Sequence, residues 1–161
     1  MIMIYTEYVQ KYRESAIELM CLLQDHERRI SKDRPPSTEV SQAQLDYLVA
    51  AVANATGKIF IAIDHDRAVG LLVVFKDGEH EGTHHVYPEF LKYGLITDFV
   101  VAESHRGSSV AIELMQLAEK FCKTEGLSTI KLAVLSLNSV ARNFYEKQGY
   151  HVQEIIYRKV I

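Results

Sequence analysis

The stretch "DFVVAESHRGSSVAIELMQLAEKFCKTEG", Asp98 to Gly126, joins an apolar strand, a short polar loop and a long amphipathic segment. The loop is 105–109, and it contains Gly107 and two serines. From there, apolar residues recur at three- and four-residue spacing, which predicts a helix from about Gly107 to Glu125 that ends at Gly126. The next apolar run, "STIKLAVLS", reads as a second strand. The stretch therefore predicts a strand–helix–strand unit with two parallel strands.

The flanking residues extend this unit into one mixed α/β domain over residues 1–161. Strands are expected at 1–8, 58–66, 68–78, 93–103, 128–136 and 150–161, with 58–78 as a hairpin. Further helices are expected at 9–30, from about Ser41 (where Ser41 and Gln44 suit a capping box) and at 138–149. The order β-α-α-β-β-β-α-β-α-β predicts an α/β (α+β) fold, in which helices cover both faces of a mixed central β-sheet.

Composition and charge narrow the functional classes. The chain has 161 residues and a formal net charge of −3, which disfavours nucleic acid and acidic membranes as partners. No apolar run approaches the ~20 residues of a membrane span. The two cysteines, Cys21 and Cys122, fall in helical patterns and make no disulfide framework, so we expect reduced core thiols and a cytoplasmic location.

The loop before the long helix is a candidate anion site. Gly107 allows close approach of a ligand, Ser108 and Ser109 are small, and Arg106 adds a positive charge. A helix that begins at Gly107 has no acidic residue in its first turn, and its free N–H groups and dipole favour an anion from outside. The alternative is an ordinary serine-capped helix beside a surface arginine. Neither the Walker loop nor the dinucleotide-binding glycine pattern is present.

Two motifs resemble the GNAT superfamily of acetyl-CoA-dependent N-acetyltransferases. In "VVAESHRGSSVA", Arg106, Ser109 and Ala111 stand where that family has Arg/Gln-x-x-Gly-x-Gly/Ala, with Ser109 in place of the usual glycine. The second motif, "NSVARNFYEKQGY", is similar to the family's Asn-x-x-Ala-x-x-Phe-Tyr-x-x-x-Gly-Phe. The resemblance implies a GNAT-like fold, acetyl-CoA as co-substrate and no metal. The coenzyme-binding residues it implies are Phe99, Val100, Val101, Arg106, Gly107, Ser108, Ser109, Val110, Ala111, Asn138 and Ala141.

The same resemblance implies two catalytic residues. Tyr145 stands at the family's tyrosine position, and a phenol with a pKa near ~10 stays protonated at neutral pH and can protonate a departing thiolate. Asp98 is a carboxylate in an otherwise apolar strand, so it must be paired, solvated or functional. In the family an acid near this position deprotonates the amine. The alternatives are a core tyrosine and a structural carboxylate.

One further motif is expected to be misleading. "HEGTH", His80 to His84, matches the zinc-protease pattern His-Glu-x-x-His, but Gly78, Gly82 and Pro88 indicate a loop rather than the required helix.

The sequence thus favours an N-acetyltransferase acting by direct transfer in a ternary complex, and a non-catalytic acyl-CoA-binding or sensor module is the alternative. The acceptor is expected to be a small-molecule or peptide amine. A homodimer through a sheet edge or a helix stays open.

Overall fold

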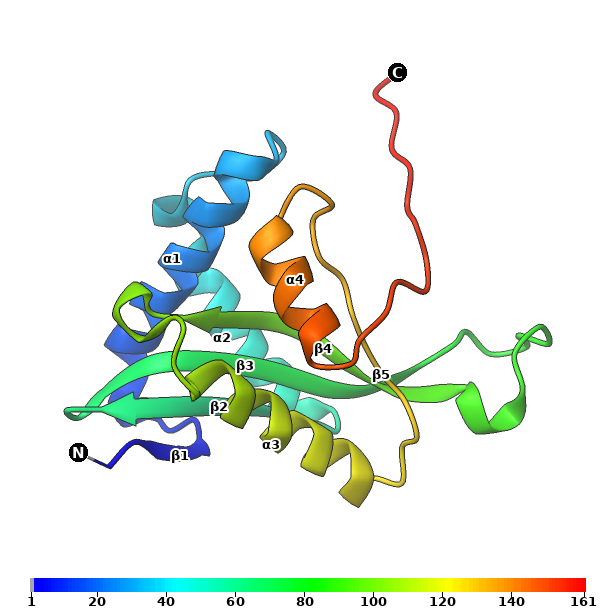
Figure 1. Ribbon diagram of the computed structural model, residues 1–161, viewed down its shortest axis with the longest axis horizontal. Helices are drawn as coiled ribbons and strands as arrows, with labels where there is room; N and C mark the ends of the chain where they lie inside the picture. Colours follow the sequence, from blue (N-terminus) through cyan, green and yellow to red (C-terminus); the bar gives the residue numbers. More distant parts are fainter. Residues whose placement is uncertain (1) are drawn as a thin grey trace.

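The computed structural model describes residues 2–161, and it contains a five-stranded mixed sheet with helices on both faces (Figure 1). The strands run in the order β1-β2-β3-β4-β5 across the sheet, antiparallel except for the parallel pair β4–β5. The predicted fold class and the parallel strand–helix–strand unit are therefore confirmed. The elements are β1 (Ile4–Glu7), α1 (Arg13–Ile30), α2 (Ser37–Asn54), β2 (Gly57–Asp64), β3 (Arg67–Gly78), β4 (Lys92–Val101), α3 (Val110–Thr124), β5 (Ile130–Leu132) and α4 (Ser139–Lys147).

The β2–β3 hairpin forms the centre of the sheet and is buried from Ile59 to Ile63 and from Ala68 to Val74. Its two-residue turn places His65 at φ 45° and Asp66 at φ 59°, the left-handed geometry that joins tightly twisted antiparallel strands. The predicted hairpin is therefore confirmed. Its central position gives each face of the sheet a continuous apolar surface on which helices pack.

Each face of the sheet carries its own apolar core. Residues of α1 and α2 pack on one face, around Leu19, Leu45 and Leu71. Residues of α3 pack on the other face around Leu72 and Leu114, and the aromatic side chains of α4 join this second core. No helix within residues 2–161 is long and apolar enough to cross a membrane.

The expected starts of two helices are wrong. Helix α2 begins at Ser37 instead of Ser41, because Pro36 holds an extended conformation that suits a helix start and Ser37 bonds to Asp25. Helix α3 begins at Val110, so its first turn does contain an acidic residue, Glu113, contrary to the expectation.

The last expected strand is also wrong. Residues 151–161 carry no secondary structure and are exposed along their whole length. The strand expected at 128–136 is shortened to β5, which ends at Leu132. Both differences have the same physical origin, because a strand is defined by a hydrogen-bonded neighbour and residues 133–136 and 151–161 have none within the described chain.

Candidate active site

The candidate site lies where β4 and β5 separate. The two strands pair only from Gly94 to Ile96 and from Ile130 to Leu132. Beyond Ile96, β4 continues to Val101 and pairs with β3 alone. Divergence of two parallel strands leaves backbone N–H and C=O groups of β4 free on the side that faces away from β3. This stretch of β4 contains Asp98 and three of the residues expected to bind the coenzyme.

A β-bulge in β4 decides which way Asp98 points. Val74 pairs with Ile96 and Val73 pairs with Asp98, so Thr97 is an extra residue without a partner in β3. The bulge inverts the alternation of side chains, since Ile96 belongs to the core under α3 whereas Val100 belongs to the core under α1 and α2. Asp98 therefore lies on the α1–α2 side. Without the bulge it would share the face of Ile96.

The environment of Asp98 favours its protonated form. Burial raises the pKa of this carboxyl, and the negative charge of Glu27 raises it further, while polar contacts with Thr97 and Gln44 act in the opposite direction. Gln44 comes from α2 and Glu27 from α1. A carboxylate that retains basicity in a partly buried setting suits proton abstraction better than one with an ordinary pKa.

Glu27 is a site residue that the sequence analysis did not select. Its charge raises the pKa of both Asp98 and Tyr145, so it lies within electrostatic range of the two expected catalytic residues. Arg34 donates from Nε to its Oε2 atom at 3.0 Å. Helical spacing could have indicated this residue in the sequence. Leu19, Leu23 and Glu27 follow one another at intervals of four along the buried side of α1.

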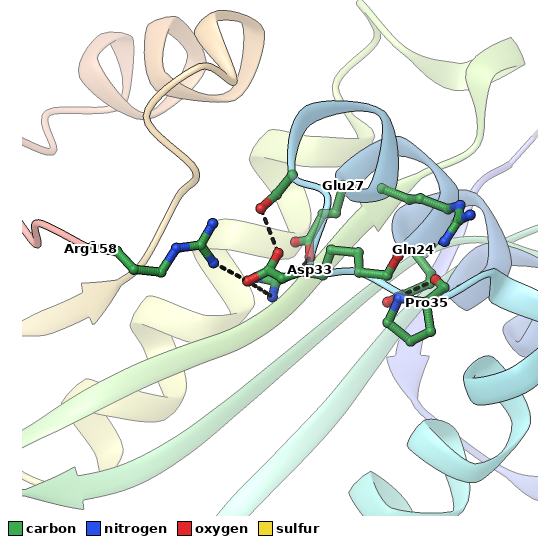
Figure 2. A network of polar contacts seen from close by, with 8 residues as sticks. Gln24, Glu27, Asp33, Pro35 and Arg158 are labelled. Atoms are coloured by element: carbon green, nitrogen blue, oxygen red, sulfur yellow. Dashed lines mark hydrogen bonds and ion pairs between the residues drawn. The ribbon is translucent and has the colours of Figure 1, made fainter. Parts of the chain in front are cut away.

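The loop between α1 and α2 is held close to this site by polar contacts (Figure 2). Gln24 donates to the Pro35 carbonyl at 2.9 Å, and Arg28 donates to the Arg34 carbonyl at 2.8 Å. Asp33 accepts hydrogen bonds from Ser31 and from Arg158. The two bonds to carbonyl groups hold the end of the loop, at Arg34 and Pro35, against α1, where Arg34 also bonds to Glu27.

Tyr145 reaches the site from α4 on the other side of β4. Its ring lies in an aromatic cluster, with centroids 6.4 Å from Phe99, 5.6 Å from Phe144 and 6.0 Å from Tyr150. Burial raises the pKa of Tyr145 to about 12, with a smaller contribution from Glu27. The phenol therefore keeps its proton at any physiological pH and is available as a donor.

The loop between β4 and α3 offers free backbone donors. Gly107 has φ 76°, a left-handed conformation that favours glycine. The N–H groups of Gly107, Ser108, Ser109 and Ala111 have no acceptor among residues 2–161. Ser109 has φ −72°, so a side chain is accommodated where the resembling family has glycine. Adjacent free N–H groups at a helix start form an anion-binding arrangement.

The side chains of the same loop mostly bond to the protein itself. Arg106 donates from Nε to the Val101 carbonyl at 3.3 Å, and Ser108 accepts from the Val110 N–H at 3.3 Å. Val110 is buried in the core under α3, so its side chain points away from any ligand. In this conformation, the loop would hold an anion mainly with backbone groups.

Asn138 and Ala141 lie at the start of α4. The Asn138 side chain accepts from the Ala141 N–H at 3.2 Å, which confirms Asn138 as the helix cap. This bond orients α4 and thereby the ring of Tyr145. Their expected contact with the coenzyme stays a prediction.

Two other candidates from the sequence, the Cys122 thiol and the "HEGTH" segment, do not belong to this site. Burial raises the pKa of the Cys122 thiol to about 11, which agrees with a core cysteine and not with a nucleophile. The "HEGTH" segment forms a loop after β3 with a turn at 81–82, as expected, so His80 and His84 are not one helical turn apart. A cavity of about 370 Å³ lies between α1 and the ends of β3 and β4, and neither Tyr145 nor Asp98 lines it.

Comparison with known proteins places the chain in a family. The model described as the acetyltransferase (GNAT) family matches residues 17–150. N-alpha-acetyltransferase 30 of Schizosaccharomyces pombe is 30% identical over 99 residues, which are 62% of this chain and 61% of that protein. The chain thus spans less than two thirds of the length of the curated relatives that it matches.

Solved structures share the fold. A predicted acetyltransferase from Clostridium acetobutylicum, solved with acetyl-CoA, superposes with a TM-score of 0.73 at 15% identity, over 99% of this chain and 96% of that one. Glucosamine-6-phosphate N-acetyltransferase from Arabidopsis thaliana gives a TM-score of 0.68 at 18% identity over 99% of both chains. At these identities the likeness concerns the fold alone.

Proposed function

Because the chain belongs to the acetyltransferase (GNAT) family, we propose that it transfers the acetyl group of acetyl-CoA directly to a primary amine in a ternary complex. Tyr145 acts as the general acid and Asp98 as the base. The observation that carries this proposal is the divergence of β4 from β5, with Asp98 on one side of the freed strand and Tyr145 on the other. This arrangement separates the proton acceptor from the proton donor, as a transfer reaction requires.

The residues present fit acetyl-CoA. The free N–H groups from Gly107 to Ala111 would hold the pyrophosphate, and the open side of Phe99 to Val101 would hold the extended arm. Bound there, acetyl-CoA supplies a thioester, which is an activated acyl group. Its sulfur leaves more readily when it receives a proton as the carbon–sulfur bond breaks. The backbone N–H groups of β4 beyond Ile96 would polarise the acyl carbonyl.

Asp98 and Tyr145 divide the proton transfers. The Asp98 carboxylate accepts a proton from the acceptor ammonium, directly or through water, so that a neutral amine attacks. The Tyr145 phenol donates its proton to the leaving sulfur and is restored afterwards from solvent. Glu27 assists the first step, since its negative charge makes Asp98 more basic. The same charge raises the pKa of Tyr145 and does not promote proton donation by the phenol.

A panel of amines tests the proposal. The protein is incubated with acetyl-CoA and, in turn, amino sugar phosphates, small diamines or peptides with a free α-amino group, and thiol release is measured. We expect release above the hydrolysis rate with at least one acceptor class, and a higher Tm with acetyl-CoA alone. A higher Tm without thiol release from any acceptor would instead support the non-catalytic acyl-CoA-binding module.

A further inference from the structure

Three polar side chains form a continuous hydrogen-bonded chain beside the end of β4. Ser104 Oγ lies 2.9 Å from Nδ1 of His105, and Nε2 of the same ring lies 3.0 Å from Oδ2 of Asp64. A carboxylate only accepts, so Nε2 carries the proton, and Nδ1 of the neutral ring accepts from the Ser104 hydroxyl. A hydroxyl that donates to an imidazole oriented by a carboxylate is the arrangement that activates a serine nucleophile.

The fold holds this chain of hydrogen bonds at one end of the sheet. Asp64 is the last residue of β2, and Ser104 and His105 lie in the single turn η3 (Glu103–His105) that follows β4. The β2–β3 turn and the loop after β4 lie at the same end of the sheet (Figure 1). The His105 and Asp64 side chains are only 20% and 19% exposed, whereas Ser104 is exposed. The base is therefore shielded and the hydroxyl is accessible to a substrate.

Ser104 also lines the cavity of about 370 Å³ that lies between α1 and the ends of β3 and β4. This volume is near the lower end of the range for small-molecule sites, which is about 300–1,000 Å³. Leu19, Leu22 and Ala102 form an apolar part of the lining. A small apolar acyl group therefore has a surface on which to pack beside the serine.

The charged groups beside the cavity are paired with one another. Arg67 donates to Glu18, and Nη1 of Arg106 lies 4.0 Å from Oε1 of Glu103. The described lining therefore offers no unpaired cation to hold a phosphate, and the carboxylate beside each arginine repels anions. An uncharged substrate suits this cavity better than acetyl-CoA does.

We propose that Ser104, His105 and Asp64 hydrolyse small neutral carboxylic esters through an acyl-serine intermediate. Ser104 Oγ bonds to the ester carbonyl carbon while its proton passes to Nδ1 of His105. The bond from that carbon to the alcohol oxygen then breaks, and the alcohol takes the proton from Nδ1. Water attacks the acyl-serine in the same way, so the acid leaves and the Ser104 hydroxyl is restored. This reaction needs neither acetyl-CoA nor an amine, and it is independent of the acetyl transfer proposed above.

Two further groups stabilise the charges that form in each step. The Asp64 carboxylate accepts from Nε2 and stabilises the imidazolium of His105, and Nδ1 of His65 lies 3.1 Å from its other oxygen. The carboxylate is thus held at both oxygens. The backbone N–H of Ser104 has no acceptor among residues 2–161, so it is free to bind the oxyanion of the attacked carbonyl.

Hydrolysis of p-nitrophenyl acetate, followed by the absorbance of p-nitrophenolate, tests this activity. We expect a burst of about one equivalent of product per protein and then a slower steady rate, as an acyl-serine accumulates. Ser104→Ala should remove the burst and lower the steady rate about tenfold or more. His105→Gln should have the same effect, because glutamine keeps an N–H donor for Asp64 but cannot take a proton.

Two matched controls account for the slow reaction of this ester with ordinary surface groups. Ser128→Ala and His84→Ala each remove an exposed residue of the same type that lies outside the hydrogen-bonded chain. Both variants should keep the burst and the steady rate. An undiminished rate in Ser104→Ala, or an equal loss in Ser128→Ala, would overturn the proposal.

Labelling with a fluorophosphonate supplies a second test, which uses the unmodified protein and does not depend on the folding of a variant. An activated serine oxygen bonds to the phosphorus of this reagent and fluoride leaves, whereas an ordinary hydroxyl reacts far more slowly. Peptide mapping by mass spectrometry should find the phosphonyl group on Ser104. A protein without the label, or with the label only on other residues, would overturn the proposal.

Discussion

The Nε2 atom of His105 lies 3.0 Å from Oδ2 of Asp64, so the loop before α3 is tied to the β2–β3 turn. A carboxylate accepts only, so Nε2 is the donor, and Ser104 Oγ lies 2.9 Å from the other ring nitrogen of His105. The loop whose N–H groups would bind the coenzyme is thereby anchored to the centre of the sheet.

This contact predicts a pH-dependent stability. The hydrogen bond from His105, and a weaker contribution from His65, lower the pKa of the Asp64 carboxyl. A carboxyl with a lowered folded pKa stabilises the protein above its unfolded pKa of ~3.9, and this stability is lost as pH falls through the folded value. Asp64→Asn should therefore have a lower Tm than the unmodified protein at pH 6, and the two Tm curves should converge below pH ~3. Parallel curves over the whole range would contradict this role.

The Asp98 carboxylate should have the opposite effect on stability and destabilise the folded protein at neutral pH. Burial raises the pKa of its carboxyl, so ionisation destabilises the folded state as pH rises from the unfolded pKa through the folded one. Asp98→Asn should raise Tm by a few degrees at pH 7 and leave it unchanged near pH 3.5, measured by calorimetry. Loss of the base should lower kcat by ~10²–10⁴-fold at the same time. A less stable Asn variant at pH 7 would show that Asp98 is a structural carboxylate.

Glu27 should shift the pH dependence of the reaction. Its charge contributes to the raised pKa of Asp98, so Glu27→Gln should move the acidic limb of the kcat/KM profile to lower pH. Glu39→Gln is the matched control, because Glu39 is an exposed residue in the first turn of α2. An identical displacement in both variants would show a general charge effect and would remove Glu27 from the site.

The sequence predicts those parts of the molecule that depend on local pattern. The β2–β3 hairpin, the amphipathic helix α3 and the cap of α4 by Asn138 all follow from spacing and turn residues within one segment. The two motifs also lead to the loop around Gly107 and to Tyr145. Their chemical roles stay predictions.

Features that depend on contacts between distant segments could not be predicted from local sequence patterns. The bulge at Thr97 arises from the register between β3 and β4, and it alone turns Asp98 toward α1. Glu27 enters the site because α1 crosses the sheet there. The segment expected as a strand at 150–161 has residues typical of a strand, yet residues 151–161 have no hydrogen-bonded neighbour in the described chain, and a local pattern does not contain that neighbour.

The coenzyme loop should be sensitive to negative charge. Ala111→Glu places a carboxylate at the free N–H groups and should weaken acetyl-CoA binding about tenfold or more, by repulsion of the phosphates. Gln116→Glu adds the same charge at an exposed position farther along α3 and should leave the Kd nearly unchanged. Calorimetric titration measures both. Equal weakening would place the coenzyme elsewhere.

Replacement of Ser109 by glycine, in contrast, should not weaken acetyl-CoA binding. Ser109 has a negative φ, and its side chain does not cap α3. Ser109→Gly should therefore keep the acetyl-CoA Kd or lower it slightly, with a small loss of stability from backbone entropy. A large loss of affinity would show that the hydroxyl, and not the backbone N–H, binds the phosphates.

The phenol of Tyr145 provides the most direct test of the chemistry. Tyr145→Phe removes one hydroxyl and retains the ring that packs against Phe99 and Phe144. Its hydroxyl makes no hydrogen bond within residues 2–161, so Tm should change little. If the phenol protonates the leaving thiolate, kcat falls by ~10²–10⁴-fold while the acetyl-CoA Kd is retained.

Tyr150→Phe is the matched control for this variant. It makes the same chemical change in the same aromatic cluster, 6.0 Å away between ring centroids, at a hydroxyl that is buried without a partner. Removal of an unsatisfied buried hydroxyl should leave kcat unchanged and keep or raise Tm. Comparison of kcat and Tm for both variants separates catalysis from packing, because loss of packing alone would lower Tm in Tyr145→Phe without slowing the remaining folded enzyme. Normal kcat in Tyr145→Phe would therefore exclude Tyr145 as the general acid.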